Sequence, residues 1–302
     1  MIDFTPNPIA LAFGPLEIRW YGIAYVAAIL AGTWLAFRLA RQRGERTDML
    51  IDGLIIVAVA ALIGGRAYHV IDQWAYYQNH LAQVVLPPYS GLGIYGGLFT
   101  GMLAIIWYAR RKHLSFWRWA DIIVPCVLLA QAVGRWGNFM NQELYGPPTN
   151  LPWGIAIQCQ YRVAEYACPA GSSPTATLGQ HFTPLFLYES VLSLIGVGVM
   201  LFLWRRFTAQ RRLLIAGDVG LIYFVWYGVE RSLLETLRSG WNWTFFGLAT
   251  AQIVGLSAAG AAIVAIFVRH WWVRRHPDAA AAAAPAEEIS APVPPIDPVP
   301  AT

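Results

Sequence analysis

The sequence predicts an all-α, polytopic membrane protein with about seven transmembrane helices. Of the 302 residues, 57% are hydrophobic and only 13% are charged, whereas a soluble domain usually has about 25% charged residues. The apolar residues gather in long runs, and roughly 20 of them are enough for a helix to cross a bilayer. Such unbroken runs argue against a transmembrane β-barrel, whose strands alternate between apolar and polar residues.

Seven apolar runs are long enough to span a membrane, and we number them as spans one to seven. They are residues 18–38, 50–69, 91–109, 119–138, 184–204, 216–235 and 246–268. Together they predict one membrane-embedded domain, residues 1–276, in which residues 139–183 form the only long loop. Residues 277–302 are rich in alanine and proline, a composition that predicts a disordered tail.

Basic residues mark every second connection between the spans. Arginines, with one lysine among them, cluster in residues 38–46, 110–118, 205–212 and 269–275, after spans one, three, five and seven. By the positive-inside rule these segments lie in the cytoplasm, which places the N-terminus and the 139–183 loop outside and the C-terminus in the cytoplasm. We interpret the clusters as topology signals and expect no nucleic-acid partner.

Five arginines near the spans lie outside these basic clusters, so topology does not explain them: Arg19, Arg66, Arg135, Arg231 and Arg238. With the orientation above, all five fall at the outer ends of the spans. An arginine near the hydrocarbon is costly and is retained where it has a partner or a function. The sequence therefore predicts a polar site in the outer leaflet.

Span six orders its polar residues on one face. Tyr227, Arg231, Glu235 and Arg238 are spaced so that they share a helical stripe. One interpretation is an ion pair of Arg231 with Glu235 that only satisfies itself. The other joins this stripe to Arg135 and a carboxylate at the end of span four in an anion-binding site, which we favour.

Phospholipid headgroups are the abundant anions at the outer leaflet, and arginine binds phosphate bidentately. Glycines at the start of span three, Gly96 and Gly97, would allow a headgroup to approach the backbone closely. Packing between membrane helices explains such glycines equally well. In the long loop, Cys159 and Cys168 form either a disulfide, as an oxidising compartment permits, or two free thiols.

The run GRWGNFMNQELYG, residues 134–146, resembles the signature Gly-Arg-x-Gly-Asn-Phe-x-Asn-x-Glu-x-x-Gly of bacterial prolipoprotein diacylglyceryl transferases. The matching residues are Gly134, Arg135, Gly137, Asn138, Phe139, Asn141, Glu143 and Gly146. The segments RWYG at 19–22, GGRAYHV at 64–70 and YGVERSLLE at 227–235 are similar to other blocks of that family. The resemblance extends from about residue 8 to 270.

This resemblance implies a multi-pass transferase of the bacterial plasma (inner) membrane, with its active site towards the outer leaflet. Such an enzyme transfers the sn-1,2-diacylglyceryl group of phosphatidylglycerol to the lipobox cysteine thiol in the signal peptide of a preprolipoprotein. A thioether forms and glycerol 1-phosphate leaves, in the first step of lipoprotein maturation. The implied partners are these two substrates and the lipid bilayer, and no cofactor or metal is implied.

The resemblance also suggests site residues. The expected catalytic residues are Arg135, Arg231, Glu143, Glu235 and Tyr95. The expected phosphatidylglycerol-binding residues are Arg135, Arg231, Asn138, Tyr21, Tyr227, Arg66, Gly96, Gly97 and Gly146. Some family members have a histidine, proposed as a base, where this chain has Tyr95. The base therefore stays open among Glu143, Glu235 and Tyr95.

Overall fold

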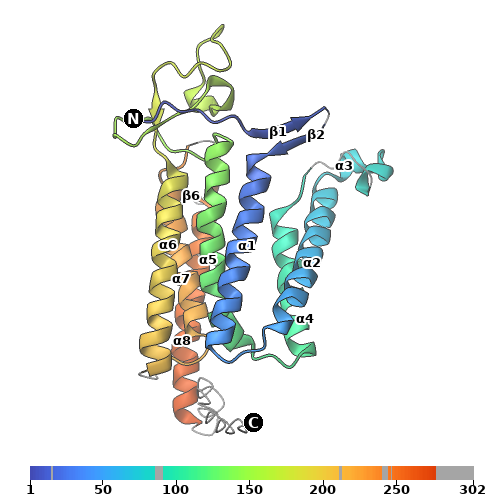
Figure 1. The fold of residues 1–302 in the computed structure, drawn as a ribbon, viewed down its shortest axis with the longest axis vertical. Coiled ribbons are helices and arrows are strands. Elements are labelled where there is room, and N and C mark those ends of the chain that lie inside the picture. The colour runs from blue at the N-terminus through green and yellow to red at the C-terminus, as the bar shows by residue number, and fades with distance from the viewer. Residues whose placement is uncertain (15, 86–90, 211–212, 240–243, 246, 277–302) are drawn as a thin grey trace, which may run out of the picture.

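The computed structural model describes residues 1–14, 16–85, 91–210, 213–239, 244–245 and 247–276. It is a bundle of long helices that carries a small loop-rich lobe at one end (Figure 1). The predicted tail, residues 277–302, lies outside the described residues. We call residues 139–183 the lobe, the end of the bundle beneath them the lobe end, and the opposite end the far end.

Five helical segments in the described part of the chain are long and apolar enough to cross a membrane. They are α1 Trp20–Gln42, α2 Asp48–Asp72, α5 Phe116–Met140, the segment Leu185–Thr208, and α8 Thr250–Arg275. The fourth consists of α6 Leu185–Leu203 and the π-helical turns of η4 Trp204–Gln210 that continue it. These five agree with predicted spans one, two, four, five and seven.

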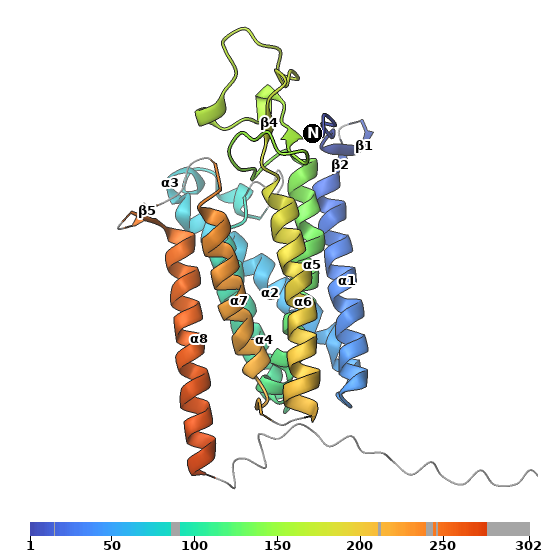
Figure 2. The same ribbon diagram turned by 90° about the vertical axis from the view of Figure 1, so that its left-hand side faces the viewer.

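The other two predicted spans correspond to α4 Ile94–Arg111 and α7 Asp218–Glu235. Each helix has 18 residues, which is near the lower limit for crossing a bilayer. α4 ends on two arginines and α7 contains Asp218, Glu230, Arg231 and Glu235. Their charge and length explain why neither helix qualifies as a span on its own, although both run alongside the others (Figure 2).

Short elements surround the lobe end of the bundle, and the sequence analysis did not anticipate them. Three antiparallel strand pairs are β1 Ile9–Phe13 with β2 Leu16–Arg19, β3 Ile155–Ala156 with β4 His181–Phe182, and β5 Thr244–Phe245 with β6 Leu248–Ala249. The short helices are α3 Trp74–Tyr77, η1 Leu81–Val84, η2 Cys159–Tyr161 and η3 Ala164–Tyr166.

α5 is the central helix, because it packs against α1, α6 and α7, and α8 packs on the far side of α7. α2 and α4 pack on one another and stand to one side of this group (Figure 1). α7 and α8 cross at glycines: a Cβ on Gly228 would lie 2.3 Å from the carbonyl oxygen of Gly255. Without a hydrophobic effect between helices in lipid, such small residues allow the close contact that holds them together.

Large apolar side chains cover the outside of the bundle. Ile63 is 65% exposed, Phe99 67% and Phe267 72%. Buried side chains such as Leu39, at 5%, are fewer and face other helices. A surface of this kind is stable against hydrocarbon, which agrees with the predicted membrane environment.

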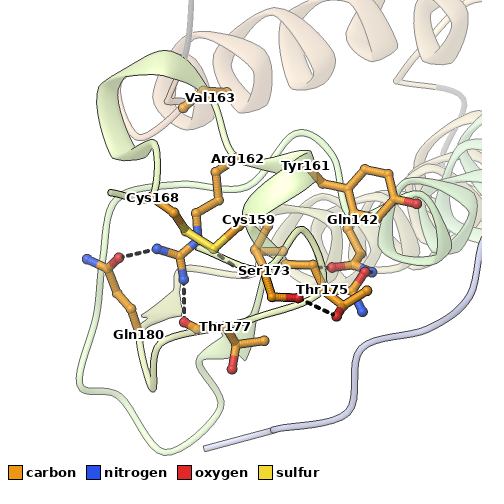
Figure 3. The surroundings of a disulfide bond; sticks show 12 residues. Gln142, Cys159, Tyr161, Arg162, Val163, Cys168, Ser173, Thr175, Thr177 and Gln180 are labelled. Atoms are coloured by element: carbon orange, nitrogen blue, oxygen red, sulfur yellow. Dashed lines mark hydrogen bonds between the residues drawn. A yellow bond between two sulfur atoms is a disulfide. The ribbon is translucent and has the colours of Figure 1, made fainter. Parts of the chain in front are cut away.

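The lobe is a compact folded unit rather than an open loop. Cys159 and Cys168 form a disulfide within it, so the structure realises the bridged alternative. Beside this bond the guanidinium of Arg162 donates to Gln180 Oε1 at 2.7 Å and to the carbonyl oxygen of Thr177 (Figure 3). The N-terminal segment is attached to the lobe through His181 Nε2, which lies 2.7 Å from Asp3 Oδ1.

A buried polar network fixes the start of α7 at the far end. Asp121 on α5 accepts hydrogen bonds of 2.8 Å from the backbone N–H groups of Gly217 and Gly220. Asp218, which is 0% exposed, lies 3.0 Å from Arg269 Nη1 and 2.6 Å from His270 Nε2, both on α8. The network thus joins α7 to α5 through one carboxylate and to α8 through the other.

Asp218→Asn is expected to lower the free energy of unfolding by about 3 kcal/mol, because it leaves Arg269 as a buried charge without its carboxylate. Thermal unfolding of the purified protein in detergent measures this effect. Asp48→Asn is the control, because its pair with Arg46 has side chains 65% and 63% exposed and should be dispensable. Equal stability of the two variants would refute a role for the Asp218 network.

Candidate active site

Three helices bring charged side chains together at the lobe end. Arg135 lies near the end of α5, Glu189 near the start of α6, and Arg231 and Glu235 in the last turns of α7. The three helices run alternately up and down (Figure 2), and the ion pairs between them show that these residues reach the same depth, although they are about 40 to 100 positions apart in the sequence. Membrane helices retain such charges where they pair inside the bundle.

The charges form one continuous chain of alternating sign. The Nε atom of Arg135 contacts Oε2 of Glu189, and Oε1 of the same carboxylate lies 3.0 Å from Nη1 of Arg231. Arg231 also binds Glu235, one helical turn along α7. Glu235 in turn lies 3.5 Å from Nη1 of Arg238. We call Arg135, Glu189, Arg231, Glu235 and Arg238 the arginine–carboxylate chain.

The arginine–carboxylate chain is mostly buried, but its arginines are partly exposed. The side chains of Glu235 and Glu189 are 2% and 10% exposed, and those of Arg231 and Arg135 are 17% and 22% exposed. Charges in such surroundings interact far more strongly than they would in water. The two arginines, each paired with a carboxylate, therefore form a compact charged centre that is still partly accessible.

Arg135 pairs with a different carboxylate from the one that the sequence analysis grouped with it. Glu143 is exposed and accepts hydrogen bonds from Asn138 Nδ2 at 2.9 Å and from Asn141 Nδ2 at 3.4 Å. Arg135 reaches this group only through Asn138, whose Oδ1 lies 3.5 Å from Nη1. The Glu143 carboxylate is therefore hydrogen-bonded by two side-chain amides and is a neighbour, not a member, of the arginine–carboxylate chain.

The backbone around Glu143 is strained. Gln142 and Leu144 have φ angles of 54° and 56°, in the left-handed region, which costs about 1–3 kcal/mol for each residue other than glycine. The buried side chain of Gln142 compensates by donating to the carbonyl oxygen of Pro6 at 3.0 Å and accepting from the N–H of Gln158 at 2.9 Å. The turn that presents Glu143 is thus held from both the N-terminal segment and the lobe.

Two expected tyrosines also lie at this end of the bundle. The ring of Tyr21, at the start of α1, packs against Gly137 of α5, and a Cβ added to Gly137 would lie 3.0 Å from it. The Tyr21 hydroxyl lies 2.9 Å from that of Tyr25. Tyr21 interacts electrostatically with Glu143 and Arg135. Tyr227 on α7 stacks on Tyr223, with ring centroids 5.7 Å apart, below the arginine–carboxylate chain.

Four expected residues belong instead to the α2–α4 pair. Arg66 donates to backbone carbonyls of the segment between these helices, including that of Val84 at 3.0 Å. A Cβ on Gly96 would lie 2.2 Å from the Gly64 carbonyl oxygen, and one on Gly97 would lie 3.1 Å from that of Ala61. These contacts support the packing interpretation of the glycines.

Tyr95 is the fourth of them. It is 59% exposed and its nearest aromatic partner is Tyr68 on α2, with centroids 6.1 Å apart. Because α2 and α4 stand to one side of the other helices (Figure 1), the structure does not bring Tyr95 to the arginine–carboxylate chain.

Gly146 packs at the junction of the lobe and the end of α7. A Cβ there would lie 2.8 Å from the Leu237 carbonyl oxygen and 3.0 Å from the Cβ of Thr183. Leu237 lies between Glu235 and Arg238 in the sequence, so Gly146 contacts the segment that carries the last two residues of the arginine–carboxylate chain. The structure therefore gives Gly146 a packing role that positions charged side chains.

Sequence reasoning missed two carboxylates. Glu189, which bridges two arginines, was not among the expected site residues. Glu230, 6% exposed, accepts from Ser193 Oγ at 3.4 Å and interacts electrostatically with Glu189 and Arg135. The available signal was the occurrence of each carboxylate within an apolar helix. In the part of the chain that the structure describes, no three His, Cys, Asp or Glu side chains are grouped as metal ligands.

Two apolar grooves lie on the outside of the helices, next to the arginine–carboxylate chain. One, of about 470 Å³, is lined by Trp153, Leu187, Tyr188, Val191, Leu192 and Leu234. Two of these lining residues are joined by a hydrogen bond of 2.8 Å from Trp153 Nε1 to the Tyr188 hydroxyl. The other, of about 380 Å³, lies between α1, α5 and α6 and includes Trp20, Trp136 and Ser190.

The chain is similar to a known family over nearly its whole described length. The family model described as prolipoprotein diacylglyceryl transferase matches residues 8–268. Relatives named phosphatidylglycerol–prolipoprotein diacylglyceryl transferase include one from Acaryochloris marina, 36% identical over 91% of this chain and 94% of its own. One from Bacillus licheniformis is 38% identical over 83% and 87%, and one from a Nostoc species is 33% identical over 90% and 92%.

Gly146→Ala is expected to destabilise the protein by about 1–3 kcal/mol, because the added methyl group overpacks a junction that includes rigid backbone. Thermal unfolding in detergent measures the loss. The matched control is Gly260→Ala on α8, where a Cβ meets nothing within 4 Å and alanine favours the helix. If Gly146→Ala were as stable as Gly260→Ala, the proposed packing role would be wrong.

Proposed function

The chain belongs to the prolipoprotein diacylglyceryl transferase family, and from that premise we propose that this transferase moves the sn-1,2-diacylglyceryl group of phosphatidylglycerol to the lipobox cysteine thiol of preprolipoproteins. The names of the relatives support phosphatidylglycerol and a prolipoprotein as the substrates. The observation that carries the proposal is that guanidinium groups from α5 and α7 meet on the single carboxylate of Glu189. Such a pair of arginines is suited to a phosphate.

We further propose that all seven long helices cross the plasma membrane, with the N-terminus and the lobe outside. Two observations support this orientation. The polar site lies at the lobe end, and basic residues such as Arg46 and Arg275 lie at the other end of the bundle. The positive-inside rule assigns the basic end to the cytoplasm. The site then faces the outer leaflet.

In the proposed reaction, the cysteine sulfur attacks carbon 3 of the diacylglyceryl group. The carbon–sulfur bond of a thioether forms while the bond from that carbon to the phosphate oxygen breaks. The electron pair of the broken bond leaves with glycerol 1-phosphate, which gains one negative charge. Arg135 and Arg231, held in place before the reaction, stabilise this growing charge more strongly in the transition state than in the ground state.

The thiol must also lose its proton, since the thiolate is the nucleophile. We infer that Glu143 accepts it. Of the two carboxylates that the sequence suggested, Glu235 is engaged by two arginines and its side chain is 2% exposed. Glu143 is exposed and is held only by the amides of Asn138 and Asn141 among the described residues. A carboxylate in that setting is the more accessible base.

The apolar grooves suit the rest of the substrate. Both grooves lie near the depth of the arginine–carboxylate chain, because their walls include Tyr188 and Ser190, the sequence neighbours of Glu189. Acyl chains lying along such surfaces would leave the headgroup beside the arginines. Trp136 and Trp153 at their upper parts are residues that favour the interface between headgroups and hydrocarbon.

Arg135→Lys is expected to retain the positive charge but to lower the transfer rate at least about 100-fold, since an ammonium group cannot replace the planar fork of donors. The assay supplies labelled phosphatidylglycerol and a lipobox peptide and measures the mass gain on its cysteine. Arg46→Lys, at the far end and 63% exposed, should keep the wild-type rate. A wild-type rate in Arg135→Lys would contradict the proposed clamp.

Glu143→Gln is expected to lower kcat by about 10² or more, as for the loss of a general base, while the affinity for phosphatidylglycerol changes little. Raising the pH should restore part of the rate, because the peptide thiol then ionises without help. Tyr95→Phe separates the two candidate bases and should have little effect. Collapse of the rate in Tyr95→Phe, with Glu143→Gln still active, would assign the base to Tyr95.

A further inference from the structure

We propose that Glu189 is a built-in substitute for the lipid phosphate, which holds the two arginines at phosphate-binding spacing in the empty site and gives way when the substrate phosphate binds. The proposal rests on the proposed function for the identity of the ligand. It makes Glu189 a positioning residue, because it acts through Arg135 and Arg231 rather than on the reacting atoms.

The geometry of the bridge is the first argument. Glu189 presents one oxygen to each guanidinium: Oε2 to Nε of Arg135 and Oε1 to Nη1 of Arg231. The two arginines come from helices α5 and α7, and the carboxylate comes from a third helix, α6. A phosphodiester also has two unesterified oxygens, each an acceptor for a charged donor. The carboxylate therefore occupies the position in which a phosphate would bind both arginines.

Charge is the second argument. Two guanidinium groups brought this close repel one another, and that repulsion is strong away from water. Glu189 is the carboxylate that contacts both guanidinium groups, so it offsets this repulsion before any substrate arrives. While it remains, however, the incoming phosphate meets arginines that are already neutralised. Binding of the substrate therefore requires the carboxylate to release at least one of them.

The other contacts of the two arginines allow this exchange to stay local. Arg231 keeps a second carboxylate, Glu235, and Arg135 keeps a contact with Asn138, so both remain oriented when Glu189 withdraws. Glu189 is fixed by the arginines at its tip and reaches them through a flexible side chain. The same reasoning explains why an acidic residue is retained at a site that binds an anion.

Glu189→Gln tests the proposal, because glutamine has nearly the same shape but no charge to compete with phosphate. Glycerol 1-phosphate is the probe, and its binding to the purified protein in detergent is measured by calorimetry. The variant is expected to bind it about tenfold more tightly, which corresponds to 1.4 kcal/mol. In the transfer assay, KM for phosphatidylglycerol should fall and kcat should fall as well, because the arginines are less well oriented.

Two controls isolate the charge effect. Glycerol, which lacks the phosphate, should show no change in binding between the wild type and Glu189→Gln. Asp121→Asn removes another buried carboxylate, at the far end of the bundle and 2% exposed, and should leave the affinity for glycerol 1-phosphate unchanged. Unchanged or weaker binding of glycerol 1-phosphate by Glu189→Gln would show that Glu189 is a permanent bridge and would overturn the proposal.

A measurement on the wild-type protein does not depend on how the variant folds. Addition of glycerol 1-phosphate should shift a carboxylate stretching band in the infrared difference spectrum as Glu189 leaves the arginines. Saturation with glycerol 1-phosphate without such a shift would also overturn the proposal. The proposed function and this inference fail in different ways. Wild-type protein that binds glycerol 1-phosphate but does not transfer the diacylglyceryl group to the peptide would refute the proposed function. Transfer by the wild type, without tighter binding of glycerol 1-phosphate in Glu189→Gln, would refute only this inference.

Discussion

The bridge of Glu189 between Arg135 and Arg231 is the interaction around which the lobe end of the bundle is arranged. It joins α5, α6 and α7 at one depth of the bundle. In a medium that cannot solvate ions, a charge is tolerated only when its partner is fixed. The bridge therefore ties the helices together and also brings together the two arginines that the proposed reaction uses.

α7 carries four charged side chains within 18 residues, and the structure fixes it at both ends. At the far end Asp121 and Asp218 connect it to α5 and α8. At the lobe end the arginine–carboxylate chain and the contact of Gly146 with Leu237 do the same. The close crossing at Gly228 and Gly255 sets its rotation between these points. A helix held in this way presents Arg231 in one orientation, which is the preorganisation that charge stabilisation requires.

Apart from Glu143 in its first turn, the lobe contributes support to the site rather than charge. The buried side chain of Gln142 holds the strained turn at Glu143, while the disulfide and the contacts of Arg162 stabilise the rest of the lobe. The α2–α4 pair has a different character, since its glycines are used for helix contact and Arg66 for binding the backbone between the two helices. The site residues therefore come from α1, α5, α6 and α7 and the turn after α5.

The sequence by itself determined the membrane environment, the positions of the long helices and the end at which the polar residues lie. It also offered the pair of Arg231 with Glu235 as one interpretation, because residues one turn apart on a helix are neighbours whatever the rest of the fold does. Only the tertiary structure decided that Arg135 binds Glu189 rather than Glu143, that Gly96 and Gly97 face α2, and that Cys159 and Cys168 are joined. Partners on different elements depend on the rotation and depth of each helix, and these are set by close packing of small residues that leaves no periodic signal in the sequence.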